Sequence, residues 1–182
     1  MSMDELWRLP ATQIVEALRN GQLHPTEAIE AAITRIEEVD CVVNALPIRC
    51  FERALDQAKF IQPSDDPRHL GGLPIAVKDY NDVAGVRTTY GSPIYENYTP
   101  ERSDATVDTL EARGAIPVAK SNVPEWAGGH TFNPVHGLTR NPWNTGRSAG
   151  GSSGGSGAAL ASGQVWLATG NDLGGSLRTP TG

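Results

Sequence analysis

Glycine is concentrated near the carboxyl end of the chain, and this uneven distribution restricts the folds open to it more than any other feature. The sequence has 182 residues and 20 glycines, and eleven of these glycines lie in the last 37 residues, from Gly146 to Gly182. Apolar stretches over 158–162 and 165–169 interrupt this segment, so it does not resemble a flexible linker. A folded site with closely approaching backbone accounts for so many residues without side chains.

The spacing of apolar residues predicts helices in the first third of the chain and an alternation of helices and strands after it. Helices are expected over 11–20 and over 25–39, the second with an apolar stripe of Ile29, Ala32, Ile33 and Ile36. A buried strand ending at Lys78 comes next. The elements expected after it are a helix over 104–113, a strand over 115–119, a helix over 154–162 and a strand over 165–169. This alternation favours an α/β fold with helices on the faces of a sheet.

Charge and cysteine content indicate the chemical setting. The formal net charge is −6, and the 15 lysines and arginines are scattered, which argues against direct binding of nucleic acid. No run of about 18 apolar residues is present, and acids occupy the place of a signal peptide's basic residues, so no membrane is expected. Two cysteines, Cys41 and Cys50, predict a cytoplasmic protein whose thiols are inert and partly buried.

The densest chemical motif is the glycine and serine run from Gly150 to Gly157. A phosphate-binding loop would need a Gly-Lys-Ser/Thr pattern, but no lysine follows Lys120, so no nucleotide cofactor is expected. The segment 151–155 matches the Gly-x-Ser-x-Gly elbow of α/β-hydrolases, with Ser153 as nucleophile. That elbow should follow a strand and precede a histidine, whereas 141–149 is irregular and all four histidines come earlier in the chain.

The histidines and acids offer weaker candidates. His130 or His136 could combine with a serine in another chain order, or could cap a loop and contact solvent. A spacing of six residues across Pro134 does not place two rings on one helical face, so a metal pair is not predicted. The segment from Asp79 to Val83 lacks a ligand and the glycine that a calcium loop requires. We therefore expect no metal.

A second serine, Ser176, follows the strand expected over 165–169 and begins a segment that is expected to be helical. Such a strand-to-helix turn could direct successive backbone amides at one anionic point, with added positive charge from the helix dipole. This would be an oxyanion hole, and its amides would come from Leu173, Gly174, Gly175 and Ser176. An ordinary glycine-containing turn explains the same fragment equally well.

Seven motifs occur in an order that resembles the N-terminal part of amidase signature family hydrolases. They are residues 72–79, 88–92, 104–105, 114–122, 141–143, 150–156 and 174–178. The resemblance covers residues 5–182, and the 24-residue step from Ser152 to Ser176 is the spacing typical of that family. The resemblance implies the amidase signature fold, a mixed twisted β-sheet flanked by α-helices.

The resemblance also implies a role for each matching residue. Ser176 corresponds to the nucleophile, Ser152 to a bridging serine that follows a cis peptide bond, and Lys78 to the base. The backbone of 173–176 would form the oxyanion hole, and the supporting residues would be Gly151, Ser153, Asp172 and Arg178. A lysine acts as a base only when neutral, so Lys78 must lose about 4 to 5 kcal/mol of its preference for the charged form, which burial could supply.

Two departures from the family pattern are expected to leave this relay untouched: Asn171, where the family more often has Thr or Ser, and residues 179–181, in place of small residues. The family's domain is far longer than this chain. We therefore expect a single amidase signature domain over 1–182 that is truncated at its C-terminus, with a helical region over 1–70 and a catalytic core segment over 71–182.

The function implied is hydrolysis of linear carboxylic acid amides to carboxylate and ammonia or amine, through an acyl-enzyme. One alternative is the glutaminase component of a tRNA-dependent amidotransferase, which passes ammonia to a partner subunit. Another is a non-catalytic fragment that retains the fold. The partner expected is a small-molecule amide substrate, with neither cofactor nor metal, and a homo-oligomer remains open.

Overall fold

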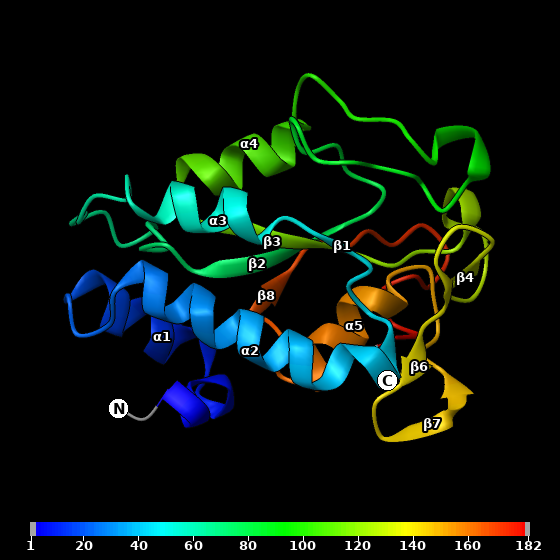
Figure 1. The fold of residues 1–182 in the computed structure, drawn as a ribbon, viewed down its shortest axis with the longest axis horizontal. Helices are drawn as coiled ribbons and strands as arrows, with labels where there is room; N and C mark the ends of the chain where they lie inside the picture. Colours follow the sequence, from blue (N-terminus) through cyan, green and yellow to red (C-terminus); the bar gives the residue numbers. More distant parts are fainter. Residues whose placement is uncertain (1–2, 181–182) are drawn as a thin grey trace.

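A computed structural model of the chain describes residues 3–180 and shows a small sheet between helices (Figure 1). Helices α1 and α2 lie along one face of the sheet and α4 lies along the other, while α3 packs against both α2 and β3. The bounds are η1 Met3–Arg8, α1 Ala11–Arg19, α2 Pro25–Val43, β1 Ile48–Arg49, α3 Phe51–Ala58, β2 Pro74–Lys78, η2 Pro93–Tyr95, α4 Ala105–Ala112, β3 Ile116–Ser121, η3 Glu125–Ala127, β4 Phe132–Asn133, β5 Gly137–Leu138, β6 Arg140–Asn141, β7 Asn144–Ser148, α5 Gly154–Ala161 and β8 Leu167–Ala168.

The main sheet is mixed, as expected. Its strand order is β1-β3-β2-β8, with β2 parallel to both β3 and β8 and with β1 antiparallel to β3. The last strand, β8, covers only two residues of the stretch predicted over 165–169. The ladder ends there because the Thr169 hydroxyl, not a backbone carbonyl, accepts the backbone N–H of Lys78 at 2.8 Å.

The ends of the longest helix, α2, follow from side chains at its first and last turns. The His24 ring accepts a hydrogen bond from the backbone N–H of Thr26, and the Glu27 carboxylate accepts one from the backbone N–H of His24. This reciprocal pair satisfies two backbone donors that a helix start leaves free. At the other end Asn44 adopts a left-handed conformation with φ 55°, which stops the helix.

Strand β2 is buried along its whole length because helices cover both faces of the sheet. Its side chains alternate between two hydrophobic clusters. Ile75 and Val77 belong to the cluster beside α1, and Ala76 belongs to the cluster beside α5. The strand therefore delivers its final residue, Lys78, to the carboxyl edge of the sheet with apolar packing behind it.

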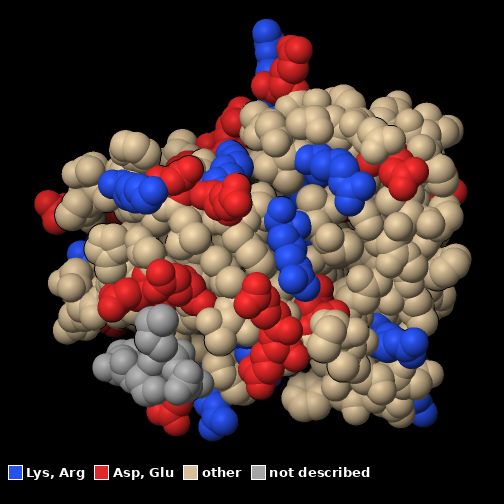
Figure 2. All heavy atoms as spheres, in the orientation of Figure 1, with Lys and Arg blue, Asp and Glu red and all other residues tan. Residues whose placement is uncertain are grey.

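The surface agrees in part with the sequence analysis. On the face drawn in Figure 2, lysine and arginine side chains are interspersed with aspartate and glutamate. No helix among residues 3–180 is long and apolar enough to cross a membrane. Cys50 is half-buried, and burial raises its pKa to about 11. The expectation that both thiols are partly buried is wrong for Cys41, which is exposed because it lies on the outer face of α2.

The packing of α2 predicts a large difference between two positions on the same helix. Ile36 is 0% exposed and Val42 is 53% exposed. Ile36→Ala should lower the free energy of unfolding by about 2 to 5 kcal/mol, because it removes buried methyl groups and leaves a cavity. Val42→Ala should change it by less than about 0.5 kcal/mol. Urea denaturation followed by circular dichroism measures both values, and equal losses would contradict the placement of the core.

Candidate active site

Lys78 is a fully buried lysine at the end of β2, and among the residues described the hydrogen-bond acceptors of its amine are neutral oxygens, while the Tyr80 ring lies 5.9 Å away. The Nζ donates to the hydroxyl of Ser152 at 2.8 Å and to the hydroxyl of Ser153 at 2.9 Å. It also donates to the side-chain oxygen of Asn171. Burial lowers the pKa of Lys78 to about 8, and the more distant Asp172 carboxylate offsets part of this effect.

The two serines that contact Lys78 lie where an irregular segment enters helix α5. The peptide bond between Gly151 and Ser152 is cis, as the family resemblance implies. A side chain at Gly151 would collide with the backbone carbonyl of Gly129, and one at Gly154 would collide with Thr131. These contacts explain why glycines surround the serines: only bare backbone lets the segment pass this close to the 129–131 loop.

Ser176 lies in the loop after β8 and is half-buried. Its backbone carbonyl accepts a hydrogen bond from the backbone N–H of Ser153 at 3.2 Å, which ties the loop to the start of α5. Among residues 3–180, however, its hydroxyl forms no hydrogen bond with Ser152 or Lys78. The structure thus joins two of the three expected relay residues directly and leaves the third beside them.

The helix expected after Ser176 is absent, and residues 173–180 form turns instead. In these turns the Asp172 carboxylate accepts the backbone N–H groups of Gly175, Leu177 and Arg178, and the chain curls around it. Its ion pair with Arg178, at 3.0 Å, together with these N–H groups, lowers the pKa of Asp172. The two expected supporting residues, Asp172 and Arg178, are thus partners of each other.

Residues 173–176, whose backbone N–H groups are expected to form an oxyanion hole, are accessible to solvent, but one of these N–H groups is already hydrogen-bonded. Leu173 and Gly174 are exposed, whereas Gly175 and Ser176 are half-buried. The Gly175 amide donates to Asp172 at 2.6 Å, so in this conformation it is not available to a substrate. An oxyanion hole here would need that amide to turn away from the carboxylate.

The histidine candidates form no hydrogen bond with Lys78 or with its serine partners among the residues described. His130 is exposed, and His136 contacts Thr89 and approaches Asp79 rather than a serine. Within residues 3–180 no group of three or more His, Cys, Asp or Glu side chains is arranged to hold a metal ion. Ser153, the elbow candidate, shares the amine of Lys78 with Ser152.

Sequence reasoning missed one direct partner of the amine. Asn171 was expected to leave the relay untouched, and this is wrong, since its side-chain oxygen accepts a hydrogen bond from Lys78. The signal was present in the sequence: Asn171 departs from the family pattern in the same glycine-rich segment as Ser176. An amide side chain is longer than Thr or Ser and can reach an amine that a short hydroxyl cannot.

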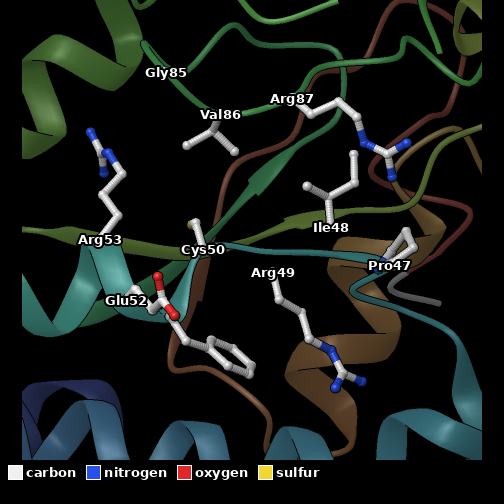
Figure 3. A pocket seen from close by; sticks show the side chains of 10 residues that line it. Pro47, Ile48, Arg49, Cys50, Glu52, Arg53, Gly85, Val86 and Arg87 are labelled. Atoms are coloured by element: carbon white, nitrogen blue, oxygen red, sulfur yellow. The ribbon is translucent and has the colours of Figure 1, made fainter. Parts of the chain in front are cut away.

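A hollow of about 590 Å³ elsewhere on the molecule is lined by residues 47–53 and 85–87, and Lys78 is not among them (Figure 3). Three arginines border it, but their side chains point in different directions. Arg53 pairs with Glu111, Arg49 approaches Asp40, and Arg87 donates to the backbone of residue 96. Because these cations are engaged elsewhere, the hollow does not present a converging anion site.

Comparison with known proteins identifies the family. The family model described as Amidase matches residues 27–182. The A subunit of glutamyl-tRNA(Gln) amidotransferase from Oleidesulfovibrio alaskensis is 40% identical over an alignment of 181 residues, which covers 98% of this chain and 37% of that protein. AtzE, the 1-carboxybiuret hydrolase component from Pseudomonas sp., is 42% identical over 182 residues, covering 94% of this chain and 39% of that protein.

Solved structures agree with the family match. The structure of 6-aminohexanoate cyclic dimer hydrolase complexed with substrate has a TM-score of 0.87 and 34% identity, covering 96% of this chain and 36% of that one. The chain belongs to the amidase signature family of hydrolases. It spans well under half the length of the relatives it matches.

The burial of Lys78 predicts a pH dependence of stability. Its pKa falls from 10.5 in the unfolded chain to about 8 in the folded one, so the unfolded state holds the proton more tightly. Stability should therefore rise as pH increases from 8 to 10.5, by roughly 3 kcal/mol at about 1.4 kcal/mol per pKa unit. Chemical denaturation of the wild type and of Lys78→Met isolates this contribution. The free energy of unfolding of the wild type, minus that of Lys78→Met, should rise over that range. A value of this difference that stays constant with pH would rule out the shifted pKa.

Proposed function

We propose that this chain carries the catalytic residues of an amidase, which hydrolyses a carboxylic acid amide to a carboxylate and ammonia or an amine. Lys78 is the general base, Ser152 the bridging hydroxyl and Ser176 the nucleophile. The single observation that carries the proposal is the buried amine of Lys78. It donates to hydroxyl and amide oxygens and to no carboxylate among the residues described.

In the first half of the reaction, neutral Lys78 accepts the hydroxyl proton of Ser152 while Ser152 accepts the proton of Ser176. The Ser176 oxygen attacks the amide carbonyl carbon and forms a C–O bond. The C–N bond then breaks as the proton returns through Ser152 to the leaving nitrogen. The first proton transfer requires the Ser176 hydroxyl to move into hydrogen-bond distance of Ser152, and the backbone hydrogen bond between Ser153 and Ser176 keeps this loop at the start of α5.

In the second half, water enters through the same relay. Lys78 takes its proton by way of Ser152, and the resulting hydroxide attacks the acyl carbon. The bond to Ser176 breaks, and the proton restores the serine hydroxyl while the carboxylate leaves. The N–H groups over 173–176 would bind the oxyanion in both halves, once the Gly175 amide has turned away from Asp172. The ion pair of Asp172 with Arg178 would then remain to hold the carboxylate.

A second function, within the same chemistry, is supported by the relatives. Several of them are A subunits of glutamyl-tRNA(Gln) amidotransferases, and these names place them in a complex. A glutaminase of this kind would release ammonia from glutamine for a partner subunit. Ammonia release from glutamine that depends on a partner would favour it, whereas hydrolysis of simple amides by the chain alone would favour a free amidase. The unpaired Cys41 and Cys50 suit a cytoplasmic location for either function.

Labelling with a fluorophosphonate probe tests the roles of the three residues. The wild-type 182-residue chain should be labelled at Ser176, and Ser176→Ala should abolish the label. Lys78→Ala should reduce the labelling rate by roughly 10²- to 10⁴-fold, the usual contribution of a general base. His130→Ala should label like the wild type.

Three results would change the assignment. Loss of labelling in His130→Ala would restore the serine–histidine alternative. Near-normal labelling of Lys78→Ala would remove the lysine relay. Absence of any label on the folded wild type would favour a fragment that keeps the fold without the activity.

The pKa of the base predicts the pH profile of the reaction. Because Lys78 must be neutral to accept a proton, kcat/KM for an amide should rise with pH and level off above about 8. Initial rates of ammonia release, measured from about pH 6 to about pH 10, give the midpoint. A rate that falls over this range would contradict a lysine base.

A further inference from the structure

A second lysine is buried next to the first, and the relay described above does not use it. Lys120, on β3, has a side chain that is 1% exposed, and its Nζ lies 3.0 Å from the fully buried carboxylate of Asp79. Asp79 is the residue that directly follows Lys78. The molecule therefore places a buried ion pair within one residue of the proposed base.

Two threonine hydroxyls from the loop that follows β2 form hydrogen bonds with this ion pair. Lys120 donates a second hydrogen bond to the hydroxyl of Thr88 at 2.7 Å. Asp79 accepts the backbone N–H of Thr89 at 3.2 Å and also its hydroxyl. Both charges are thus hydrogen-bonded in fixed directions, which a buried pair needs to offset its loss of solvation.

His136 covers the carboxylate from a third segment. Its Nε2 lies 3.3 Å from the Thr89 hydroxyl and 4.0 Å from Asp79. Burial lowers the pKa of His136, and the Asp79 carboxylate opposes this effect. Among the residues described, Lys120 is the lysine or arginine that forms an ion pair with Asp79, and no other such side chain lies within salt-bridge distance of that carboxylate.

The pair lies on the opposite face of the sheet from the serines. Adjacent residues of an extended strand point to opposite faces, so the side chain of Asp79 turns away from the side on which Lys78 meets Ser152. The register pairs Val77 with Lys120, and the backbone N–H of Asp79 donates to Ser121 at 2.9 Å. Two interactions thus hold the end of β2: the backbone hydrogen bond from Asp79 to Ser121, and the ion pair on the face of the sheet away from Ser152.

We propose that the Asp79–Lys120 ion pair is a positioning unit for the amide hydrolysis proposed above. It fixes the end of β2 so that the amine of Lys78 stays against Ser152 and Ser153. Apolar side chains of the same volume would fill this space at lower cost in desolvation, but they would not fix the orientation of the end of β2, because their contacts are not directional. The pair touches neither the serines nor the loop of Ser176, so it acts through the backbone of Lys78.

The three lysines of the chain, Lys59, Lys78 and Lys120, make a direct measurement feasible. In a protein with ¹³C-labelled lysine, each side chain gives its own signal, and the Lys78→Met and Lys120→Met variants assign them. Asp79→Asn and Lys120→Met should each move the titration of Lys78 from about 8 toward the ordinary lysine value by about one pH unit or more, because the freed amine reaches water. They should also lower kcat by roughly 10- to 100-fold, with KM within about twofold.

The matched control is Asp40→Asn. Asp40 is another buried carboxylate, which accepts the backbone N–H of Ala45 at 2.6 Å and lies 3.8 Å from Arg49. Its loss should destabilise the fold and leave the titration of Lys78 unchanged. If Asp79→Asn behaves in the same way, with stability lowered but the Lys78 titration and kcat as in the wild type, the pair is only structural and the inference is overturned.

A milder variant decides the question if Asp79→Asn and Lys120→Met fail to fold. Thr88→Val removes one acceptor of Lys120 at constant volume and should move the Lys78 titration upward by a smaller amount, whereas an unchanged titration overturns the inference. The titration needs no substrate. If the wild type has no amidase activity, the proposed function alone is refuted. If the wild type is active but Asp79→Asn leaves the titration of Lys78 unchanged, the positioning role alone is refuted.

Discussion

The proposed chemistry depends on keeping the amine of Lys78 out of water. A lysine in water holds its proton until well above neutral pH, and no arrangement of nearby serines changes that by itself. Strand β2 removes the amine from water because helices cover both faces of the sheet, and the hydrogen-bond acceptors left to the amine among the residues described are neutral oxygens. A carboxylate hydrogen-bonded to the amine would stabilise the cation and end its use as a base.

The two buried lysines show how environment separates identical side chains. Lys78 faces hydroxyls and an amide, whereas Lys120 faces the carboxylate of Asp79. Adjacent strands of one sheet therefore carry one buried lysine whose hydrogen-bond acceptors are neutral and one that forms an ion pair. Burial lowers the pKa of both amines, and the carboxylate of Asp79 opposes that effect at Lys120.

Local patterns predicted what depends on near neighbours. The buried strand ending at Lys78 and the helices near both ends agree with the sequence analysis. The approach of Lys78 to Ser152, 74 positions away, was implied by the family resemblance and not by a local pattern. Two features were missed. The Asp172 carboxylate binds backbone amides of the residues just after it, where a helix was expected from Ser176. Asn171 reaches a lysine 93 positions away, and no periodicity in the sequence encodes such a contact.

Ser153 joins two parts of the molecule that would otherwise respond separately. Its hydroxyl lies on the amine of Lys78, and its backbone N–H holds the carbonyl of Ser176. The start of α5 thus contacts both the proposed base and the loop of the proposed nucleophile. In the proposed mechanism, a shift of that loop on substrate binding would be transmitted through Ser153 to its hydrogen bond with Lys78.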